Sequence, residues 1–188
     1  MAIPLKTTSS TTSSPPKQVG STSQKANSEQ FLTFSVSPTQ KVMLATRQLV
    51  EILNLSLGQI TAIADVAPTV MGVCNWRGEV LWVVDLAYLM GFEPIYRSGY
   101  TQTNCSVILV RQNASQRESQ GIAIGLAVTQ VGQMLWCESE QILPAPATIA
   151  NSGMGKFLRG YWLNETGWLE GSETLLVLNG DALVRAFQ

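Results

Sequence analysis

Three charged side chains of this sequence lie close enough together to suggest chemistry. Arg77 and Glu79 flank Gly78 in a turn-like segment, and Asp85 follows inside an apolar run. Two carboxylates can serve as general acid and base in glycosidases when they are about 5–9.5 Å apart. Glu79 and Asp85 are six residues apart, which in an extended chain is roughly 20 Å at about 3.3 Å per residue. The spacing argues against such a catalytic pair.

Asp85 and Arg77 each have a structural interpretation as well as a functional one. An unpaired carboxylate is costly among valines and Leu86, so Asp85 is expected to accept hydrogen bonds from backbone amides or an arginine, as an anchor rather than a catalytic acid. Gly78 can adopt a positive-φ turn that presents Arg77 outward as a bidentate donor. Alternatively, Arg77 is a solvated arginine in an ordinary hairpin, or the buried partner of Asp85.

Other common chemistries are excluded by residue types. The chain has no histidine, which removes histidine-based triads and imidazole metal sites. It contains no glycine-rich phosphate loop, so no cofactor is predicted. Cys74, Cys105 and Cys137 are about thirty residues apart without a CxxC pair, a pattern that favours small apolar residues in a reducing cytosol over a disulfide or zinc framework.

Composition predicts a globular protein that binds no nucleic acid and does not insert into a membrane. The 188 residues are 45% hydrophobic and only 13% charged, against a usual charged fraction of about 25%. Residues 29–188 hold 9 basic and 13 acidic side chains, so no basic surface for nucleic acid is expected. The uncharged run 119–137 contains glutamines and glycines, which argues against membrane insertion. The start of the chain lacks the apolar core of a secretory signal, so a cytoplasmic location is expected.

The first 28 residues differ in composition from the rest. They contain 12 serines and threonines, two adjacent prolines and no acidic side chain. Such a segment buries too little apolar surface to offset the entropy of ordering, so residues 1–28 are predicted to be a disordered tail and 29–188 the folded domain. A phosphorylated or docking tail is the functional alternative.

Hydrophobic periodicity predicts an all-β protein. Residues 31–36 alternate as a half-buried strand, and 41–46 can pair back onto them as a hairpin. Leu49, Ile52 and Leu53 have helical spacing, which predicts a helical turn or two. Further strands are predicted at residues 80–86, 105–111, 121–128 and Thr174–Leu178. Many short strands indicate a barrel or sandwich, and no internal repeat is evident.

The strand at 121–128 has faces of different size. Ile122, Ile124, Leu126 and Val128 form a large apolar face, whereas Gly125 lies between two alanines on a small one. A small face lets a second layer approach closely. We therefore expect this strand to lie between two packed units.

Residues 71–91, MGVCNWRGEVLWVVDLAYLMG, resemble the central signature of CheW-like domains, xGxxNLRGxxxPVxDLxxxLG. The flanking segments FLTFSV, LVEIL, EQILPAPA, FLRG and TLLVLNGDALV keep the family order, so the resemblance covers residues 29–188. It implies two packed five-stranded β-barrels with one or two short helices. It also implies a non-catalytic adaptor that couples the cytoplasmic tip of a chemoreceptor to a CheA-type histidine kinase, recruited to membrane-associated receptor arrays.

The resemblance also carries candidate partner-binding residues, by motif position. They are Leu49, Glu51, Ile52, Gly72, Asn75, Arg77, Gly78, Gly125, Leu126 and Val128. The chain departs from the family pattern at four nearby positions, with Trp76 for leucine, Trp82 for proline, Thr129 for an acid and Asn179 for aspartate.

Two other functions remain open on the sequence. The first is a small ligand-binding or hydrolytic β-barrel using Asp85 and Glu79, which a deep cavity lined by ionisable groups would favour. An open apolar groove between barrels would favour the adaptor. The second is a related protein that competes within a receptor array, which the sequence does not distinguish from an active coupler.

Overall fold

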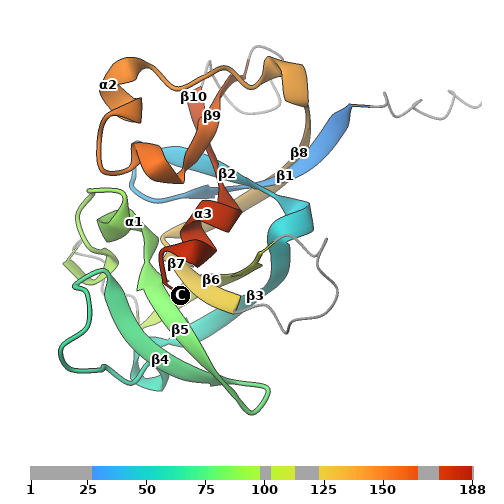
Figure 1. The fold of residues 1–188 in the computed structure, drawn as a ribbon. Coiled ribbons are helices and arrows are strands. Elements are labelled where there is room, and N and C mark those ends of the chain that lie inside the picture. Colours follow the sequence, from blue (N-terminus) through green and yellow to red (C-terminus); the bar gives the residue numbers. More distant parts are fainter. Residues whose placement is uncertain (1–26, 98–102, 113–122, 165–173, 188) are drawn as a thin grey trace, which may run out of the picture.

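The computed structural model describes residues 27–97, 103–112, 123–164 and 174–187. Ten strands within these ranges form two five-stranded sheets, each curled into a barrel (Figure 1). The strands of barrel 1, in sheet order, are β8 (Gln130–Glu138), β1 (Ser28–Ser35), β2 (Lys41–Ala45), β10 (Thr174–Leu178) and β9 (Leu158–Leu163). Those of barrel 2 are β3 (Leu49–Ser56), β6 (Asn104–Arg111), β7 (Ala123–Val128), β5 (Glu79–Asp85) and β4 (Val70–Trp76).

Short helical segments connect the strands. The α-helices are α1 (Leu86–Leu89), α2 (Ala147–Ala150) and α3 (Gly180–Arg185). The 3-10 turns are η1 (Thr46–Gln48), η2 (Leu57–Gln59), η3 (Ile95–Arg97), η4 (Ser139–Gln141) and η5 (Gly155–Phe157). None of the helices in the described ranges is long and apolar enough to cross a membrane.

Each barrel is closed by one isolated bridge. Thr61, which follows β3 and η2, exchanges backbone hydrogen bonds of 2.8 and 2.9 Å with Val73 on β4. Leu143, which follows β8 and η4, exchanges two bonds of 2.8 Å with Tyr161 on β9. The bridges join the segment after one edge strand to the opposite edge, so both sheets are closed in the same way.

The two halves of the chain have the same order of elements. The first half places β1 and β2 in barrel 1 and then β3, β4, β5 and α1 in barrel 2. The second places β6 and β7 in barrel 2 and then β8, β9, β10 and α3 in barrel 1. Asp85 caps α1 and Asn179 caps α3, each accepting a backbone N–H three residues on. The fold is therefore an internal repeat with exchanged strands, which the sequence does not reveal.

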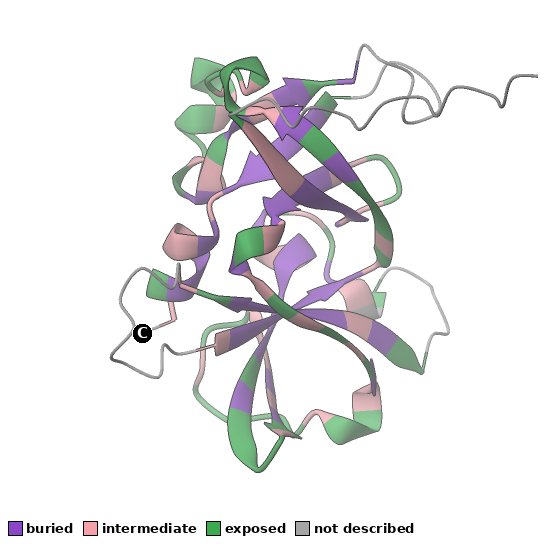
Figure 2. Cartoon of the chain, turned by 90° about the vertical axis from the view of Figure 1, so that its right-hand side faces the viewer, coloured by how far each residue is buried: buried purple, intermediate pink, exposed green. Residues whose placement is uncertain are grey.

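The largest core lies between the barrels rather than inside either. It combines residues of both sheets, including Phe34, Leu44, Ile108 and Leu126, with helix residues such as Leu183. Two smaller clusters fill the barrel interiors, and buried segments gather where the barrels meet (Figure 2). Because each barrel holds strands from both halves of the chain and shares this core, the barrels pack as one unit.

The predicted all-β fold with two five-stranded barrels is confirmed. Strands lie at the predicted segments 31–36, 41–46, 80–86, 105–111 and Thr174–Leu178, with ends that differ by at most three residues. In the segment 121–128 the described part, from Ala123, is strand β7. The predicted tail, residues 1–28, lies outside the described residues except for its last two.

The predicted helical turn at Leu49, Ile52 and Leu53 is wrong. These residues belong to strand β3, which pairs with β6 from Leu49↔Val110 to Ser56↔Asn104. A register shift between Leu49 and Glu51 disturbs the alternation at the start of the strand, which left the helical spacing as the stronger local signal. Pairing with β6 outweighs this local preference.

Strand β7 lies between two packed layers, as predicted. The second barrel, however, packs on the face with the large residues and not on the small face. Its large residues Ile124, Leu126 and Val128 face the core shared by the barrels. Its small residues face the interior of barrel 2, where a Cβ on Gly125 would lie 2.7 Å from Val107 Cγ1. The close approach is therefore to the neighbouring strand's side chains inside the barrel, since a small barrel has little interior room.

The three cysteines are free and buried, as predicted for small apolar residues. Burial raises the pKa of each thiol, that of Cys137 to about 11. A thiol with a raised pKa is a poor nucleophile at neutral pH. Among the described residues, no group of histidine, cysteine or acidic side chains has the arrangement to hold a metal ion.

Candidate functional site: the end of barrel 2

The β4–β5 hairpin turn places Arg77 at the end of barrel 2. Arg77 and Gly78 have φ of 54° and 87°, as in the type I′ turns whose twist matches two paired strands. The Gly78 N–H donates to Asn75 Oδ1 over 3.3 Å, which satisfies the turn locally. The side chain of Arg77 is 70% exposed. The predicted outward presentation of Arg77 is therefore what the fold shows.

Glu51, at the start of β3, contacts this hairpin across the barrel end. Its Oε2 accepts a hydrogen bond from Arg77 Nη2 at 3.0 Å and another from the indole Nε1 of Trp76 at 3.0 Å. The guanidinium carbon of Arg77 lies 5.3 Å from the centroid of the Trp76 ring, within the range of a cation–π contact. Three side chains, from strand β3, strand β4 and the hairpin turn, thus form one cluster, Glu51–Trp76–Arg77.

The electrostatics of this cluster suit recognition rather than catalysis. With side chains 70% and 33% exposed, the Arg77–Glu51 pair stabilises the fold by no more than about 1 kcal/mol. Arg77 carries five N–H donors, and most of its surface faces solvent. An exposed guanidinium held in place can bind a carboxylate or a cluster of carbonyl oxygens on another molecule.

Of the predicted partner-binding residues, the structure brings four together at this end of barrel 2. They are Glu51, Asn75, Arg77 and Gly78. Ile52 lies one residue further along β3, 39% exposed on its outer face, whereas Leu49 is half-buried against the shared core.

The other four predicted residues are buried in this structure. Leu126 and Val128 are 0% and 1% exposed in the shared core, and Gly125 is buried inside barrel 2. Gly72 is buried with φ of +144°, against the closing bridge of the barrel. Burial of Leu126 and Val128 follows from the position of β7, a central strand with a core on each face.

Two features of the site were not identified from the sequence. One is the contact of Trp76 with Glu51 and Arg77. The other is an exposed apolar pair on the outer face of β5, Val80 at 71% and Trp82 at 36% exposure. The sequence signal that could have pointed to both features is the departure from the family signature, in which Trp76 replaces the usual leucine and Trp82 the usual proline.

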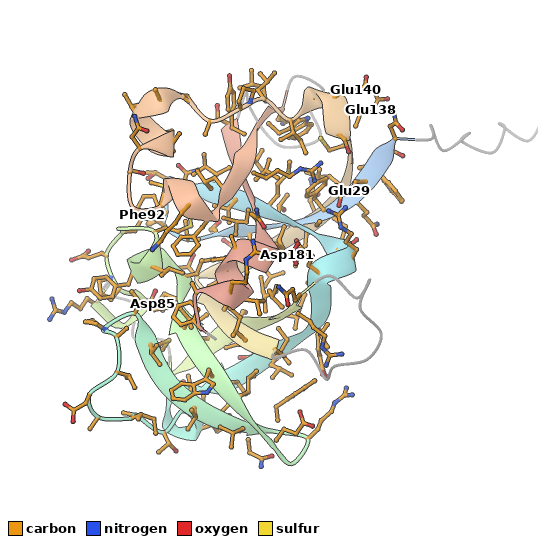
Figure 3. The ribbon with its side chains drawn as sticks, in the orientation of Figure 1. Glu29, Asp85, Phe92, Glu138, Glu140 and Asp181 are labelled. Atoms are coloured by element: carbon orange, nitrogen blue, oxygen red, sulfur yellow. The ribbon has the colours of Figure 1, made fainter. Side chains whose placement is uncertain are left out.

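Asp85 is a structural anchor, as predicted, and not the partner of Arg77. Its Oδ1 accepts from the Tyr88 N–H at 3.0 Å and its Oδ2 from the Ile95 N–H at 2.8 Å, so it caps α1 and holds the loop that follows (Figure 3). Burial raises the pKa of this carboxyl, and the backbone hydrogen bonds oppose the rise. Both oxygens are engaged, and Glu79 is exposed in the hairpin, so the two carboxylates share no site.

A groove of about 450 Å³ lies between the barrels. Its walls come from barrel 1 through Ser35 and Lys41, from barrel 2 through Ile95 and Cys105, and from Thr129 between β7 and β8. The lining is mainly hydroxyl, amide and apolar groups, and neither Asp85 nor Glu79 contributes. It is therefore neither the ionisable cavity expected of a hydrolase nor the purely apolar groove expected of the adaptor.

Comparisons with known proteins agree with this fold. The family model described as CheW-like domain matches residues 30–188. Among solved structures, the chain is similar to the crystal structure of the scaffolding protein TtCheW from Thermoanaerobacter tengcongensis, with 19% sequence identity and a TM-score of 0.62. That match covers 80% of this chain and 88% of the other. A search of curated proteins finds no match.

Proposed function

Because this chain belongs to the CheW-like domain family, we propose that it is a chemotaxis-type adaptor that couples a chemoreceptor to a CheA-type histidine kinase. The family match extends over the whole described domain, which supports a scaffold role. The observation that carries the proposal is the exposed Arg77, held at the end of barrel 2 by Glu51 and Trp76. An ordered, exposed arginine beside apolar surface is typical of protein–protein contact sites.

The proposed partner surface is centred on the hairpin end of barrel 2. Glu51, Ile52, Asn75 and Arg77 supply side chains, and Gly78 supplies the turn. Leu49, Gly72, Gly125, Leu126 and Val128 act indirectly in this proposal, by holding β3, β4 and β7 in place. One barrel face contacts the regulatory domain of the kinase, and the groove between the barrels accepts the receptor tip. Neither contact requires a metal, nucleotide or cofactor.

A small hydrolase is less well supported than an adaptor. Both oxygens of Asp85 accept backbone hydrogen bonds, and the described residues that line the groove between the barrels include no carboxylate. General acid–base catalysis needs a titratable group within hydrogen-bond reach of a bound substrate. A competitor that occupies an array without activating the kinase differs from a coupler only in its effect on kinase activity.

The domain boundary and the location belong to the same proposal. Residues 29–188 form the adaptor domain and 1–28 a disordered tail, in a cytoplasmic protein recruited to receptor arrays. Deleting residues 1–26 is expected to leave the melting temperature within about 2 °C, because the tail has too little apolar surface to pack. Differential scanning calorimetry of the full and shortened chains measures this. A loss of several degrees would show that the tail packs on the domain.

Arg77→Ala is expected to weaken partner binding without unfolding the domain. Losing an exposed ion pair lowers the free energy of unfolding by no more than about 1 kcal/mol. Losing an arginine from an interface weakens binding by about 2 kcal/mol, or roughly 30-fold. Titration calorimetry with the kinase regulatory domain and with a receptor-tip fragment from the same cell, alongside urea melts, separates the two effects.

Lys156→Ala is the matched control for Arg77→Ala, since it removes one exposed positive charge, and its contact with the Phe157 ring, from the turn η5 before β9. It is expected to leave both affinities within about twofold. If Arg77→Ala binds both partners as tightly as the unchanged protein, this surface is not the partner site. Binding to neither partner, or turnover of nucleotide by the purified chain, would contradict the adaptor function itself.

A further inference from the structure

Trp76 contacts both members of the ion pair at the end of barrel 2. Its indole N–H donates to the same Glu51 oxygen that accepts from Arg77, at 3.0 Å in each case. The centroid of its ring lies 5.3 Å from the guanidinium carbon. We propose that Trp76 is a positioning residue, which holds Arg77 in the orientation that a partner's acidic group recognises. This inference rests on the proposed function, in which Arg77 contacts a partner.

The position of Trp76 in the barrel explains why it can orient a neighbour. The ring packs against the core of barrel 2, so the indole is fixed by the fold and not by Arg77. Its N–H points at Glu51, and its face is available to the guanidinium. The leucine usual at this position has neither an N–H nor an aromatic face, so it could not make either contact.

Orientation matters because a free arginine side chain has many rotamers. Immobilising such a side chain at an interface weakens binding by about 2- to 10-fold. In this protein Glu51 holds the guanidinium through one nitrogen and Trp76 supports it through the ring, before any partner arrives. The part of the guanidinium that faces solvent is thus ready for a second anionic or carbonyl acceptor.

The partner chemistry follows from the charges of the cluster. Glu51 neutralises Arg77 only in part, because the pair is exposed and screened by solvent. Arg77 keeps donors that Glu51 does not use. We therefore expect a partner that offers an aspartate or glutamate to Arg77, in a contact that weakens as salt concentration rises.

A double-mutant cycle tests whether Trp76 acts through Arg77. Trp76→Leu, Arg77→Ala and the double variant are titrated with the kinase regulatory domain and the receptor-tip fragment. For the partner that Arg77→Ala weakens, Trp76→Leu is expected to reduce affinity about 3- to 10-fold when Arg77 is present. In the Arg77→Ala protein it should change affinity by less than twofold. Trp76→Phe keeps a ring but loses the N–H, so its affinity for that partner should lie between the affinities of the unchanged protein and of Trp76→Leu.

Trp136→Leu is the control for tryptophan removal, because Trp136 is 54% exposed on barrel 1. Whatever its own effect, it should combine additively with Arg77→Ala. If Trp76→Leu weakens binding equally with and without Arg77, Trp76 does not act through Arg77 and the inference is overturned. If Arg77→Ala has no effect on either partner, the proposed partner site fails instead, so the two failures are distinguishable.

An NMR measurement on the protein alone checks the contact between Trp76 and Glu51 without relying on a binding assay or on a Trp76 variant that fails to fold. In the NMR spectrum, Glu51→Gln is expected to shift the indole N–H resonance of Trp76, because its acceptor loses charge, while the Trp136 indole resonance stays in place. An unshifted Trp76 resonance would contradict the contact on which the inference depends. If urea melts show that Trp76→Leu does not fold, the cycle with Trp76→Phe decides, with a smaller expected effect of about 2- to 3-fold.

Discussion

Gly72→Ala is expected to lower the free energy of unfolding by about 3 kcal/mol or more, from backbone strain and lost hydrogen bonds. Gly72 has φ of +144°, and a Cβ there would lie 2.2 Å from the carbonyl oxygen of Thr61. Thr61 is the residue that closes barrel 2 through its two hydrogen bonds with Val73. The added methyl group must therefore displace the backbone that closes the barrel.

Two other glycines separate the causes of this effect. Gly78 has φ of +87° with nothing within 4 Å of a Cβ, so Gly78→Ala tests strain alone and should lose about 1–2 kcal/mol. Gly160 has no positive φ, but a Cβ would lie 2.2 Å from the Leu143 oxygen in the bridge of barrel 1, so Gly160→Ala tests the clash alone. Urea unfolding measures all three. Equal losses at Gly72 and Gly78 would show that the bridge can shift without cost.

Asp85→Ala is expected to lower the free energy of unfolding by about 3 kcal/mol. Removing a helix N-cap costs about 0.5–2 kcal/mol, and leaving a buried N–H without an acceptor costs about 1–3 kcal/mol. Asp85 supplies both acceptors, for the N–H groups of Tyr88 and Ile95. Thermal or urea unfolding of the variant checks the prediction. A loss below about 1 kcal/mol would mean that water replaces the carboxylate.

Asp85→Asn is the matched control, because asparagine is a good N-cap but offers only one oxygen. It should lose about 1–2 kcal/mol, mainly at the Ile95 N–H. The two proteins should also differ in pH dependence. Burial raises the folded-state pKa of Asp85 above its ordinary value, so the folded state binds a proton more readily than the unfolded state.

The sign of that pH dependence follows from linkage. With a raised folded-state pKa, the contribution of Asp85 to stability is greatest at acid pH and falls as pH rises through the folded-state pKa. The unfolding free energy of the unchanged protein, relative to Asp85→Asn, should therefore increase as pH is lowered from 7 towards 4. A decrease over the same range would show that the backbone hydrogen bonds outweigh burial and depress the pKa.

Local patterns in the sequence were sufficient to predict the positions of most strands. Alternation at 31–36 predicted β1, because successive side chains of a strand point to opposite faces. Short apolar runs at 80–86 and 105–111 predicted β5 and β6, because such runs are typical of buried strands. The same logic predicted that Asp85 is hydrogen-bonded, since a carboxylate among valines cannot remain unpaired. Where a competing local signal existed, as in β3, pairing with a distant strand decided the outcome.

The partner site could be predicted only in part. Asn75, Arg77 and Gly78 lie within four residues of one hairpin, so the turn and the exposure of Arg77 follow from short-range geometry. The candidates on β7 came from motif position, which does not say which core covers each face of the strand. Burial of Leu126 and Val128 results from the packing of barrel 1 onto barrel 2.

By itself, the sequence determined the all-β class, the strands with clear periodicity, the hairpin turn at Gly78 and the signature of the family. Only the tertiary structure decided the exchange of strands between barrels, the closing bridges at Thr61 and Leu143, and the cluster of Glu51 with Trp76 and Arg77. Glu51 is 25 residues from Trp76 in the chain. Contacts over such separations depend on how the sheets curl and close, and no local preference of either segment encodes that closure.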